Sequence, residues 1–343
     1  MFTSWLHQPV KTVSKPMAMA AQDHFARLSG PPGALGALEE IAVRMAAMSQ
    51  RMDPEADPAQ ITLFFADHGV AHAGVAGISE DVTPMWLRNC LRGTSASAVM
   101  ARSLGLRYEV VDLGLARDPG PLPGLIQQRI GPGTTDFRTT PAMSEQQLFA
   151  ALGAGRDAVL RADQAGCRLF IGGEAGSGRT TSAGALVCAL LGIPPESIAG
   201  PGSGISPEAL AVKAQVIQEA VDHHARFFSN PLDVLRRLGG YETVALCGAY
   251  ITCGQVGMAA VVDGFCSSVA ALVAATLHPT LNNWLFFGHH AAEPGQYPIF
   301  RSLNSRPLLH LDMRLGEGTG ALAAFPIIRA ACSLLKHTLP PPQ

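Results

Sequence analysis

One short segment gathers residues that could do acid–base chemistry. It reads LGEGTG (residues 315–320) and places the carboxylate of Glu317 between Gly316 and Gly318. Glycine accepts positive φ angles and lets a ligand approach the backbone closely. An apolar run at 321–335 follows, so we expect a helix start, where free N–H groups favour an anion. A glutamate held there could act as a base toward a substrate whose anionic part binds close by. A plain helix start with a favourably placed acidic residue is the simpler alternative.

Two glycine-rich loops earlier in the chain could bind a phosphate. GEAGSGRT (173–180) follows an expected strand at 168–171 and precedes an apolar helix, so its N–H groups would point at a bound anion. The second loop, GPGSG (200–204), precedes an expected helix that carries Lys213. We expect the N–H groups of both loops to cradle one phosphate, with Lys213 supplying the charge. An ordinary exposed helix lysine is the alternative for Lys213.

The first loop also comes close to the nucleotide-binding pattern G-x-x-x-x-G-K-[ST]. Arg179 stands where that pattern has lysine, and the run AAVVD (259–263) could pass for an acidic, magnesium-holding strand. Arginine does not reproduce the compact charge of that lysine. Glu174 would also put a carboxylate beside a triphosphate. A P-loop-like nucleotide-binding protein is therefore the weaker alternative.

Composition narrows the class of protein. Of 343 residues, 48% are hydrophobic and 15% charged, with 36 Gly, which favours a large packed α/β core. A net charge of −2 gives no electrostatic basis for nucleic-acid binding. The seven cysteines include no CxxC pair, and no HExxH or Cys/His cluster occurs, so we expect neither a disulfide framework nor a metal site. The N-terminus lacks an apolar signal core, which predicts a cytoplasmic protein.

The order of expected elements predicts the fold class. Expected helices cover residues 18–28, 37–52, 85–104 and 144–165, with another around Lys213. Expected strands cover residues 61–66, 108–113, 168–171, 243–246, 259–262 and 284–288. This alternation predicts an α/β protein with a doubly wound, mainly parallel, Rossmann-like sheet.

Two further features of the chain need an interpretation. The uncharged stretch 243–262 contains glycines and polar residues, so we read it as two buried elements and not as a membrane span. Polar residues follow several strands, as is typical of a ligand crevice. We expect His68 to form a structural pair with Asp67, and Asp263 either to bind ribose hydroxyls or to start a turn. We place His289 and His290 in a loop near the site.

Together these motifs resemble the nicotinate-nucleotide:dimethylbenzimidazole phosphoribosyltransferase family. The resemblance starts with LSGPPGALGALEEIAVRMAAM (28–48) and FADHGVAHAGVAG (65–77), and it continues with the two glycine loops and VVDGF (261–265). It ends with GHHAAEPGQ (288–296) and DMRLGEGTGA (312–321). The order and spacing of the motifs are specific, although each alone is weak.

The resemblance implies a fold, a reaction and an assembly. It implies a large α/β domain (56–320), a small helical domain from both chain ends (1–55 with 321–343) and a homodimer. The reaction would transfer the phosphoribosyl group of nicotinate mononucleotide to an aromatic base with inversion, without a cofactor. Glu317 matches the general base. The residues expected to hold the phosphate and ribose are Glu174, Gly176, Ser177, Gly178, Arg179, Thr180, Gly202, Ser203, Gly204, Lys213, Asp263, Gly316 and Gly318.

Departures from the family pattern concern the acceptor base. We expect Ser79, Met85 and Ala175 to line its pocket. Ala175, Ser177 and Arg179 replace the usual Met, Ile and Asn, and Met85 replaces a glutamine. Apolar packing would then recognise the acceptor, which could be dimethylbenzimidazole, another benzimidazole, a purine or a phenol. A paralogue that binds a nucleotide without turnover is the remaining alternative.

Overall fold

The computed structural model describes residues 4–339 except residues 29, 32 and 203. Its centre is a seven-stranded sheet in the order β3-β2-β1-β4-β5-β6-β7, and every neighbouring pair is parallel. The strands are β1 (Ala59–Ala66), β2 (Arg107–Gly114), β3 (Leu125–Gln127), β4 (Leu169–Ala175), β5 (Ala259–Val262), β6 (Leu285–His290) and β7 (Pro307–His310). The order runs outward from β1 in both directions, so the predicted doubly wound parallel fold is confirmed.

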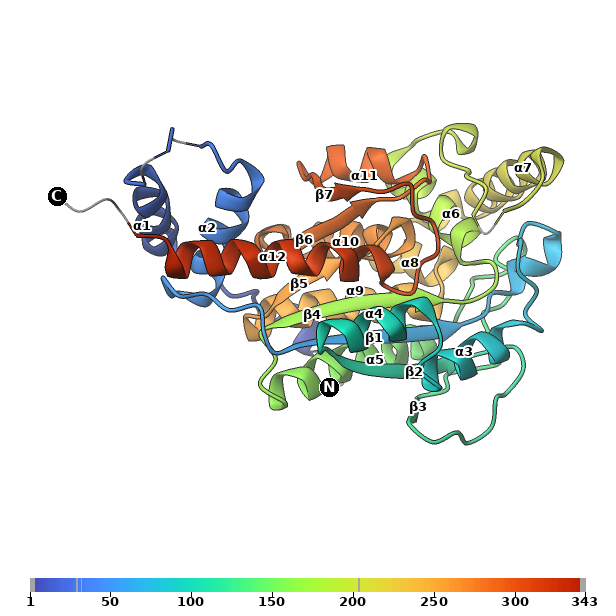
Figure 1. The fold of residues 1–343 in the computed structure, drawn as a ribbon. Helices are drawn as coiled ribbons and strands as arrows, with labels where there is room; N and C mark the ends of the chain where they lie inside the picture. The colour runs from blue at the N-terminus through green and yellow to red at the C-terminus, as the bar shows by residue number, and fades with distance from the viewer. Residues whose placement is uncertain (1–3, 29, 32, 203, 340–343) are drawn as a thin grey trace.

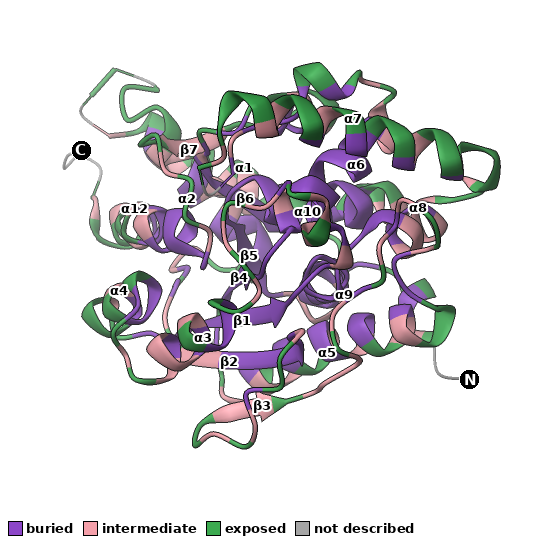
Figure 2. Ribbon diagram, turned by 90° about the vertical axis from the view of Figure 1, so that its right-hand side faces the viewer, coloured by how far each residue is buried: buried purple, intermediate pink, exposed green. Residues whose placement is uncertain are grey.

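Helices cover both faces of this sheet (Figure 1). One face carries α5, α9 and α10, and the other carries α3, α4 and α12. The helices are α1 (Lys15–Ala26), α2 (Ala37–Ser49), α3 (Thr83–Leu91), α4 (Ala96–Leu104), α5 (Glu145–Gln164), α6 (Arg179–Leu191), α7 (Pro207–His224), α8 (Pro231–Leu238), α9 (Tyr241–Val256), α10 (Phe265–Leu277), α11 (Gln296–Ser302) and α12 (Thr319–His337). The strands and α9 and α10 form the buried centre, whereas α7 exposes one side (Figure 2).

The two chain ends meet beside the sheet. The α1 and α2 helices pack on each other, and α2 also packs on α12 (Figure 1). Among the described residues, α12 is the helix with the length and composition to cross a membrane, but 56% of its most apolar stretch is buried. It packs on β6 and α2 as a core helix. The division into a small helical domain and a large domain stays a prediction.

Four expectations about the elements are corrected. His289 and His290, expected in a loop, are the last two residues of strand β6. Residues 243–246 lie inside the buried helix α9 and do not form a strand. The single helix expected at 85–104 is two helices, because Gly93 takes a φ of 75° and Ser95 then caps α4 by accepting from the Ala98 N–H. The strand expected at 168–171 continues to Ala175, so Glu174 belongs to the sheet and not to the loop.

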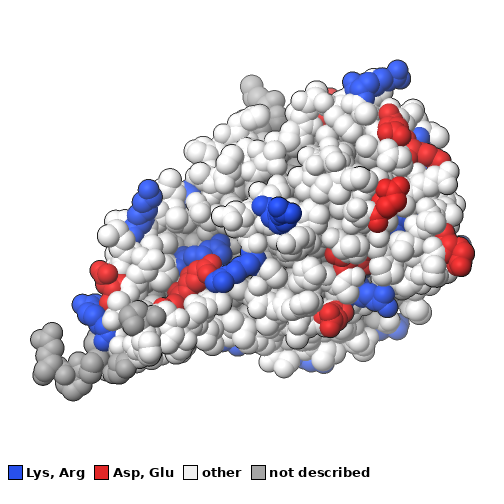
Figure 3. Space-filling model, turned by 90° about the horizontal axis from the view of Figure 1, so that it is seen from above, with Lys and Arg blue, Asp and Glu red and all other residues white. Residues whose placement is uncertain are grey.

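Charged side chains are sparse on the molecular surface seen from above. Figure 3 shows single charged side chains scattered over this face and one small group in which Lys or Arg lies against Asp or Glu, and other residues form most of the face. This mixture on the drawn face agrees with a net charge of −2. A nucleic-acid-binding surface would instead need clustered Lys and Arg.

Candidate active site

The predicted motifs meet at the carboxyl ends of β1 and β4, where the strand order changes direction. Asp67 follows β1, and Glu174 lies near the end of β4. The LGEGTG segment crosses this edge before α12 begins, and the Glu317 N–H donates to the Glu174 carbonyl oxygen at 3.2 Å. Ligands of open parallel sheets bind at such a switch point.

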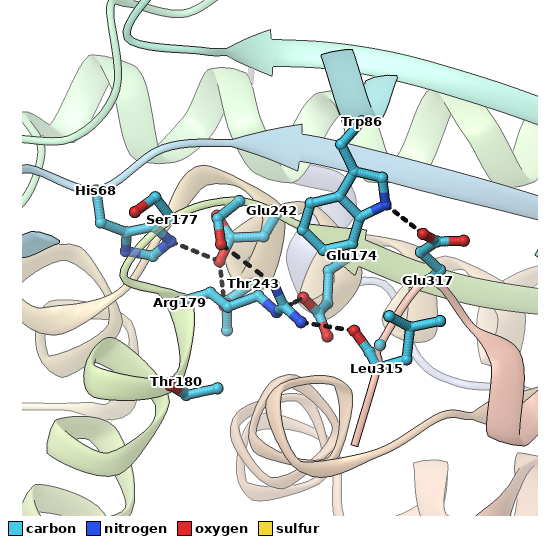
Figure 4. A network of polar contacts seen from close by, with 12 residues as sticks. His68, Trp86, Glu174, Ser177, Arg179, Thr180, Glu242, Thr243, Leu315 and Glu317 are labelled. Carbon is cyan, nitrogen blue, oxygen red and sulfur yellow. Dashed lines mark hydrogen bonds and ion pairs between the residues drawn. The ribbon is translucent and has the colours of Figure 1, made fainter. Parts of the chain in front are cut away.

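The Glu317 carboxylate is held from two other helices. Its residue is 2% exposed and adopts a φ of 57°. Oε2 accepts hydrogen bonds from Ser97 N at 3.2 Å and from Ser97 Oγ at 2.6 Å. Oε1 accepts one from the indole Nε1 of Trp86 (Figure 4). Because Ser97 N lies in the first turn of α4, the helix dipole favours the negative charge there.

Sequence reasoning missed Ser97 and Trp86, and it named Met85, the residue just before Trp86, for the acceptor pocket. Met85, expected in the acceptor pocket, is 57% exposed. The next residue, Trp86, turns toward Glu317, because one step along a helix rotates the side chain by about 100°. Ser79 is also exposed, and Ala175 is fully buried in β4, so no described contact joins these three expected pocket residues. A helical-wheel comparison of Met85 and Trp86 could have found the aromatic side chain.

Arg179 joins the glycine loop to the LGEGTG segment. Its Nε lies 2.7 Å from Oε2 of Glu174, and Nη2 donates to the Leu315 carbonyl oxygen at 2.7 Å (Figure 4). Its guanidinium carbon lies 5.2 Å from the centre of the Trp86 ring. Burial raises the pKa of the Glu174 carboxyl, and the charge of Arg179 opposes that increase. Arg179 therefore contacts protein groups on several sides, unlike a P-loop lysine, which reaches the phosphates.

The glycine loop packs tightly on the end of β1. A side chain at Gly176 would place its Cβ 1.6 Å from the Ala66 carbonyl oxygen, so only glycine fits there. Ser177 N donates to Oδ1 of Asp67 at 2.9 Å, and Ser177 Oγ donates to the Ile78 carbonyl oxygen at 2.5 Å. The helix α6 starts directly after Gly178, whose φ is 85°. The first turn of α6 thus presents N–H groups that lack partners within the helix.

Lys213 reaches both glycine loops from α7. It is 1% exposed, and its Nζ donates to Thr180 Oγ1 at 2.9 Å and to the Gly200 carbonyl oxygen at 2.8 Å. Burial lowers the pKa of Lys213, and the charge of Glu293 opposes that decrease. The alternative of an ordinary exposed lysine is therefore wrong. This ammonium, with the start of α6, forms a site suited to an anion.

The remaining loop residues expected in the phosphate site differ in how they are placed. A Cβ on Gly202 would lie 2.8 Å from Thr180 Oγ1, so the two glycine loops touch. Gly204 takes a φ of 104° in the same loop. Ser203 lies outside the described residues.

Three acidic residues near the site have structural partners. Asp263 is fully buried after β5, and its Oδ1 accepts from Ala321 N at 3.0 Å and so fixes the start of α12. His289 Nε2 lies 3.8 Å from the same oxygen. The sequence predicted a pair of His68 with Asp67, but the structure pairs His68 with Glu242, and its Nε2 lies 2.9 Å from Glu242 Oε1. Asp67 instead accepts from Thr83 Oγ1 at 2.8 Å and from the loop at Ser177.

Comparisons with known proteins identify the family. A family model described as Phosphoribosyltransferase (DBI_PRT) matches residues 10–339. The nicotinate-nucleotide–dimethylbenzimidazole phosphoribosyltransferase of Pseudomonas syringae pv. syringae (strain B728a) is 46% identical, over 97% of this chain and 95% of that protein. The protein of the same name from Pseudomonas aeruginosa (strain LESB58) is 45% identical over the same shares.

Solved structures agree with this result. CobT from Thermus thermophilus is similar with a TM-score of 0.89 and 39% identity, over 93% of this chain and 96% of that chain. The family predicted from the sequence motifs is therefore confirmed. The chain belongs to the DBI_PRT family of phosphoribosyltransferases, and it is an enzyme of the pentosyltransferase class.

Proposed function

We propose that the enzyme transfers the phosphoribosyl group of nicotinate mononucleotide to an aromatic base, 5,6-dimethylbenzimidazole or a related one, and releases nicotinate. The Pseudomonas relatives are named for this pair of substrates. The observation that carries the proposal for this chain is the position of Glu317. Its buried carboxylate has one oxygen fixed by Ser97 and lies on the same sheet edge as the glycine loops.

The chemistry needs one base and an oriented acceptor. A nitrogen lone pair of the acceptor attacks C1 of the ribose, and the bond from C1 to nicotinate breaks with its electron pair returning to the pyridine nitrogen. Nicotinate leaves with a neutral ring nitrogen, so no acid is needed. The azole acceptor must lose its N–H proton, and Glu317 takes it as general base. Ser97 donates twice to Oε2, whereas Trp86 donates once to Oε1, so Oε1 keeps a lone pair and is the oxygen that receives the proton.

The phosphoribosyl group needs an anion site and polar partners for its hydroxyls. We place the phosphate at the start of α6, between the two glycine loops, where Lys213 supplies the charge. Asp263 Oδ2 has no hydrogen-bond partner among the described residues and would accept from a ribose hydroxyl. Positioning C1 against the acceptor is then the main work of the loops.

The acceptor itself is the open part of this proposal. The N–H edge of Trp86 points at Glu317 and Arg179 lies over the Trp86 ring, so an aromatic acceptor at Glu317 would bind beside an indole and a guanidinium. This surrounding suits benzimidazoles in general, and the preferred base could differ from dimethylbenzimidazole. A homodimeric assembly and a cytoplasmic location stay predictions.

Release of free nicotinate tests the proposal directly. The wild type and Glu317→Gln are incubated with nicotinate mononucleotide and a panel of benzimidazoles, purines and phenols, and nicotinate is followed by chromatography. We expect release that requires an acceptor and falls about a hundredfold or more in the variant. Glu145→Gln, on the exposed start of α5, is the matched control and should retain wild-type rates. No release with any acceptor, or equal rates in wild type and Glu317→Gln, would refute the proposal.

A further inference from the structure

A small group of hydroxyl-bearing side chains lies behind the Glu317 carboxylate. Ser97 Oγ donates to Oε2 of Glu317 at 2.6 Å, and the same Oγ lies 2.9 Å from Tyr108 Oη and 3.1 Å from Ser95 Oγ. Both serines belong to the start of α4, whereas Tyr108 comes from β2. Among the described residues, the hydrogen bonds of Tyr108 reach Glu317 only by way of Ser97.

The hydrogens of this group have one consistent arrangement. A serine hydroxyl has one hydrogen and two lone pairs, and an ionised carboxylate can only accept. The Ser97 hydrogen therefore points at Glu317, and Ser97 Oγ turns only lone pairs toward Tyr108. The Tyr108 hydroxyl must then donate to Ser97. Two hydrogen bonds thus run in series, from Tyr108 to Ser97 and from Ser97 to Glu317, and each polarises and strengthens the other.

The other titratable neighbours in this group add no second charge beside Glu317. Burial raises the pKa of Tyr108, so its hydroxyl keeps its hydrogen and remains a donor. Cys90, on α3, borders the same hydroxyls, and burial raises the pKa of its thiol to about 11. The group therefore surrounds one oxygen of Glu317 with neutral hydrogen-bonding side chains.

This arrangement suits Glu317 both before and after it takes a proton. When Oε1 receives the proton, Oε2 becomes a carbonyl oxygen and still accepts from Ser97. No hydroxyl has to turn during the transfer, and donors fixed in advance cost no reorganisation at that moment. Ser97 is fully buried, so without the Tyr108 hydroxyl it would lose a partner that water does not replace, and its own hydroxyl could turn toward Ser95.

We propose that Tyr108 is a positioning residue of the transferase, whose hydroxyl fixes the Ser97 hydroxyl on Glu317 and so holds the base in line with the acceptor. This inference rests on the proposed function, in which Glu317 is the base. Tyr108 acts on the base and not on a substrate. Its loss should therefore lower kcat and leave the KM of both substrates nearly unchanged.

Removal of a single hydroxyl tests this role. Tyr108→Phe keeps the ring, and Tyr297→Phe is the same substitution on α11, where the side chain is 59% exposed. In the nicotinate-release assay we expect kcat of Tyr108→Phe to fall roughly threefold to tenfold, as for the loss of one neutral hydrogen bond. Both KM values should stay within about twofold, and Tyr297→Phe should match the wild type. An unchanged kcat in Tyr108→Phe, or a change confined to KM, overturns the inference.

A double variant separates the hydrogen bond from simple packing. Ser97→Ala should lower kcat roughly 10- to 100-fold, because its hydroxyl donates to a charged group. In that background Tyr108→Phe should change kcat by less than about twofold, since its only route to Glu317 is already gone. An equal fall in both backgrounds would show that Tyr108 acts through packing, and it would overturn the inference while the proposed function stands. If no acceptor supports nicotinate release in the wild type, the proposed function fails and this inference fails with it.

Discussion

Removal of the Arg179 guanidinium should destabilise the protein and slow turnover together. Arg179 is 7% exposed, lies 2.7 Å from the Glu174 carboxylate and donates to the carbonyl oxygens of Leu315 and Gly176. Removing one member of a buried ion pair costs about 3–5 kcal/mol, because the other charge is left without a partner. Burial raises the pKa of Glu174 to about 8, so this loss applies where the carboxyl is ionised, and we expect Arg179→Met to lower the free energy of unfolding by about 4 kcal/mol at about pH 9.

The loss of stability in Arg179→Met should depend on pH, because Glu174 titrates. Burial raises the pKa of Glu174, and in Arg179→Met no guanidinium opposes the increase. The folded variant then holds a proton on Glu174 over a wider range than the wild type. With Arg179 present the pKa of Glu174 is about 8, so both folded proteins hold this proton at lower pH. The loss of stability of the variant should therefore grow only as the pH rises above about 8, by at most about 1.4 kcal/mol per pH unit.

Urea unfolding of a double-mutant cycle measures the interaction free energy between Arg179 and Glu174. Arg179→Met with Glu174→Gln removes both charges, so the double variant should regain about 2 kcal/mol relative to the sum of the two single losses. Arg329→Met is the matched control, since its partner Asp57 is 48% exposed, and it should lose less than about 1 kcal/mol. Single losses that add to within about 0.5 kcal/mol would refute the buried pair as the cause.

The turnover rate should show that Arg179 also positions the segment that carries Glu317. The hydrogen bond to Leu315 fixes the residue two positions before Glu317. A shift of about 1 Å in a reacting group can cost about a hundredfold in rate. We expect kcat of Arg179→Met to fall by that order with a smaller change in KM, measured by nicotinate release under conditions where the variant remains folded.

Two further predictions concern the anion site and the buried His68–Glu242 pair. Lys213→Met should raise the KM for nicotinate mononucleotide roughly 10- to 100-fold and leave the acceptor KM unchanged, because the charged hydrogen bond that we propose to the phosphate would be lost. An unchanged donor KM in the release assay would remove Lys213 from the proposed phosphate site. Burial raises the pKa of Glu242, but the charge and hydrogen bond of His68 outweigh it and lower the pKa below its usual 4.5. The stability from this group is present above the unfolded pKa and is lost as the pH falls through the lowered folded pKa. Urea unfolding from about pH 5 to about pH 3 should thus show a weaker pH dependence in Glu242→Gln than in the wild type, and equal slopes would contradict this reasoning.

The sheet could be predicted from the sequence because its strands have local patterns. The run ITLFFA (61–66) is β-rich, and the strand–glycine loop–helix order after β4 is a local pattern. A strand was wrongly predicted at 243–246 because this stretch also has a local strand pattern, with a valine and a threonine that favour strands. In the structure it belongs to α9, which is buried on nearly all sides and therefore shows no apolar stripe with helical period.

Site residues could be predicted from the sequence only where they lie in or near a recognisable motif. Glu317 and Lys213 stand within or just after glycine-rich motifs. Ser97 and Trp86 contact Glu317 across 220 and 231 residues of chain, and nothing in their own neighbourhoods indicates that pairing. The sequence pointed to Met85 and not to Trp86 because departures from a family pattern mark a position in the sequence but not the direction of its side chain.

The conformation of Glu317 explains why these distant contacts matter. Gly316, Glu317 and Gly318 all have positive φ, at 83°, 57° and 70°, and only the glutamate is disfavoured there. A left-handed conformation costs a residue with a Cβ about 1–2 kcal/mol, so it persists only where surrounding contacts impose it. Here the Glu174 carbonyl oxygen holds the backbone of Glu317, and Ser97 holds its carboxylate. The carboxylate is therefore aimed by the end of β4 and the start of α4, and the LGEGTG motif alone would not place it.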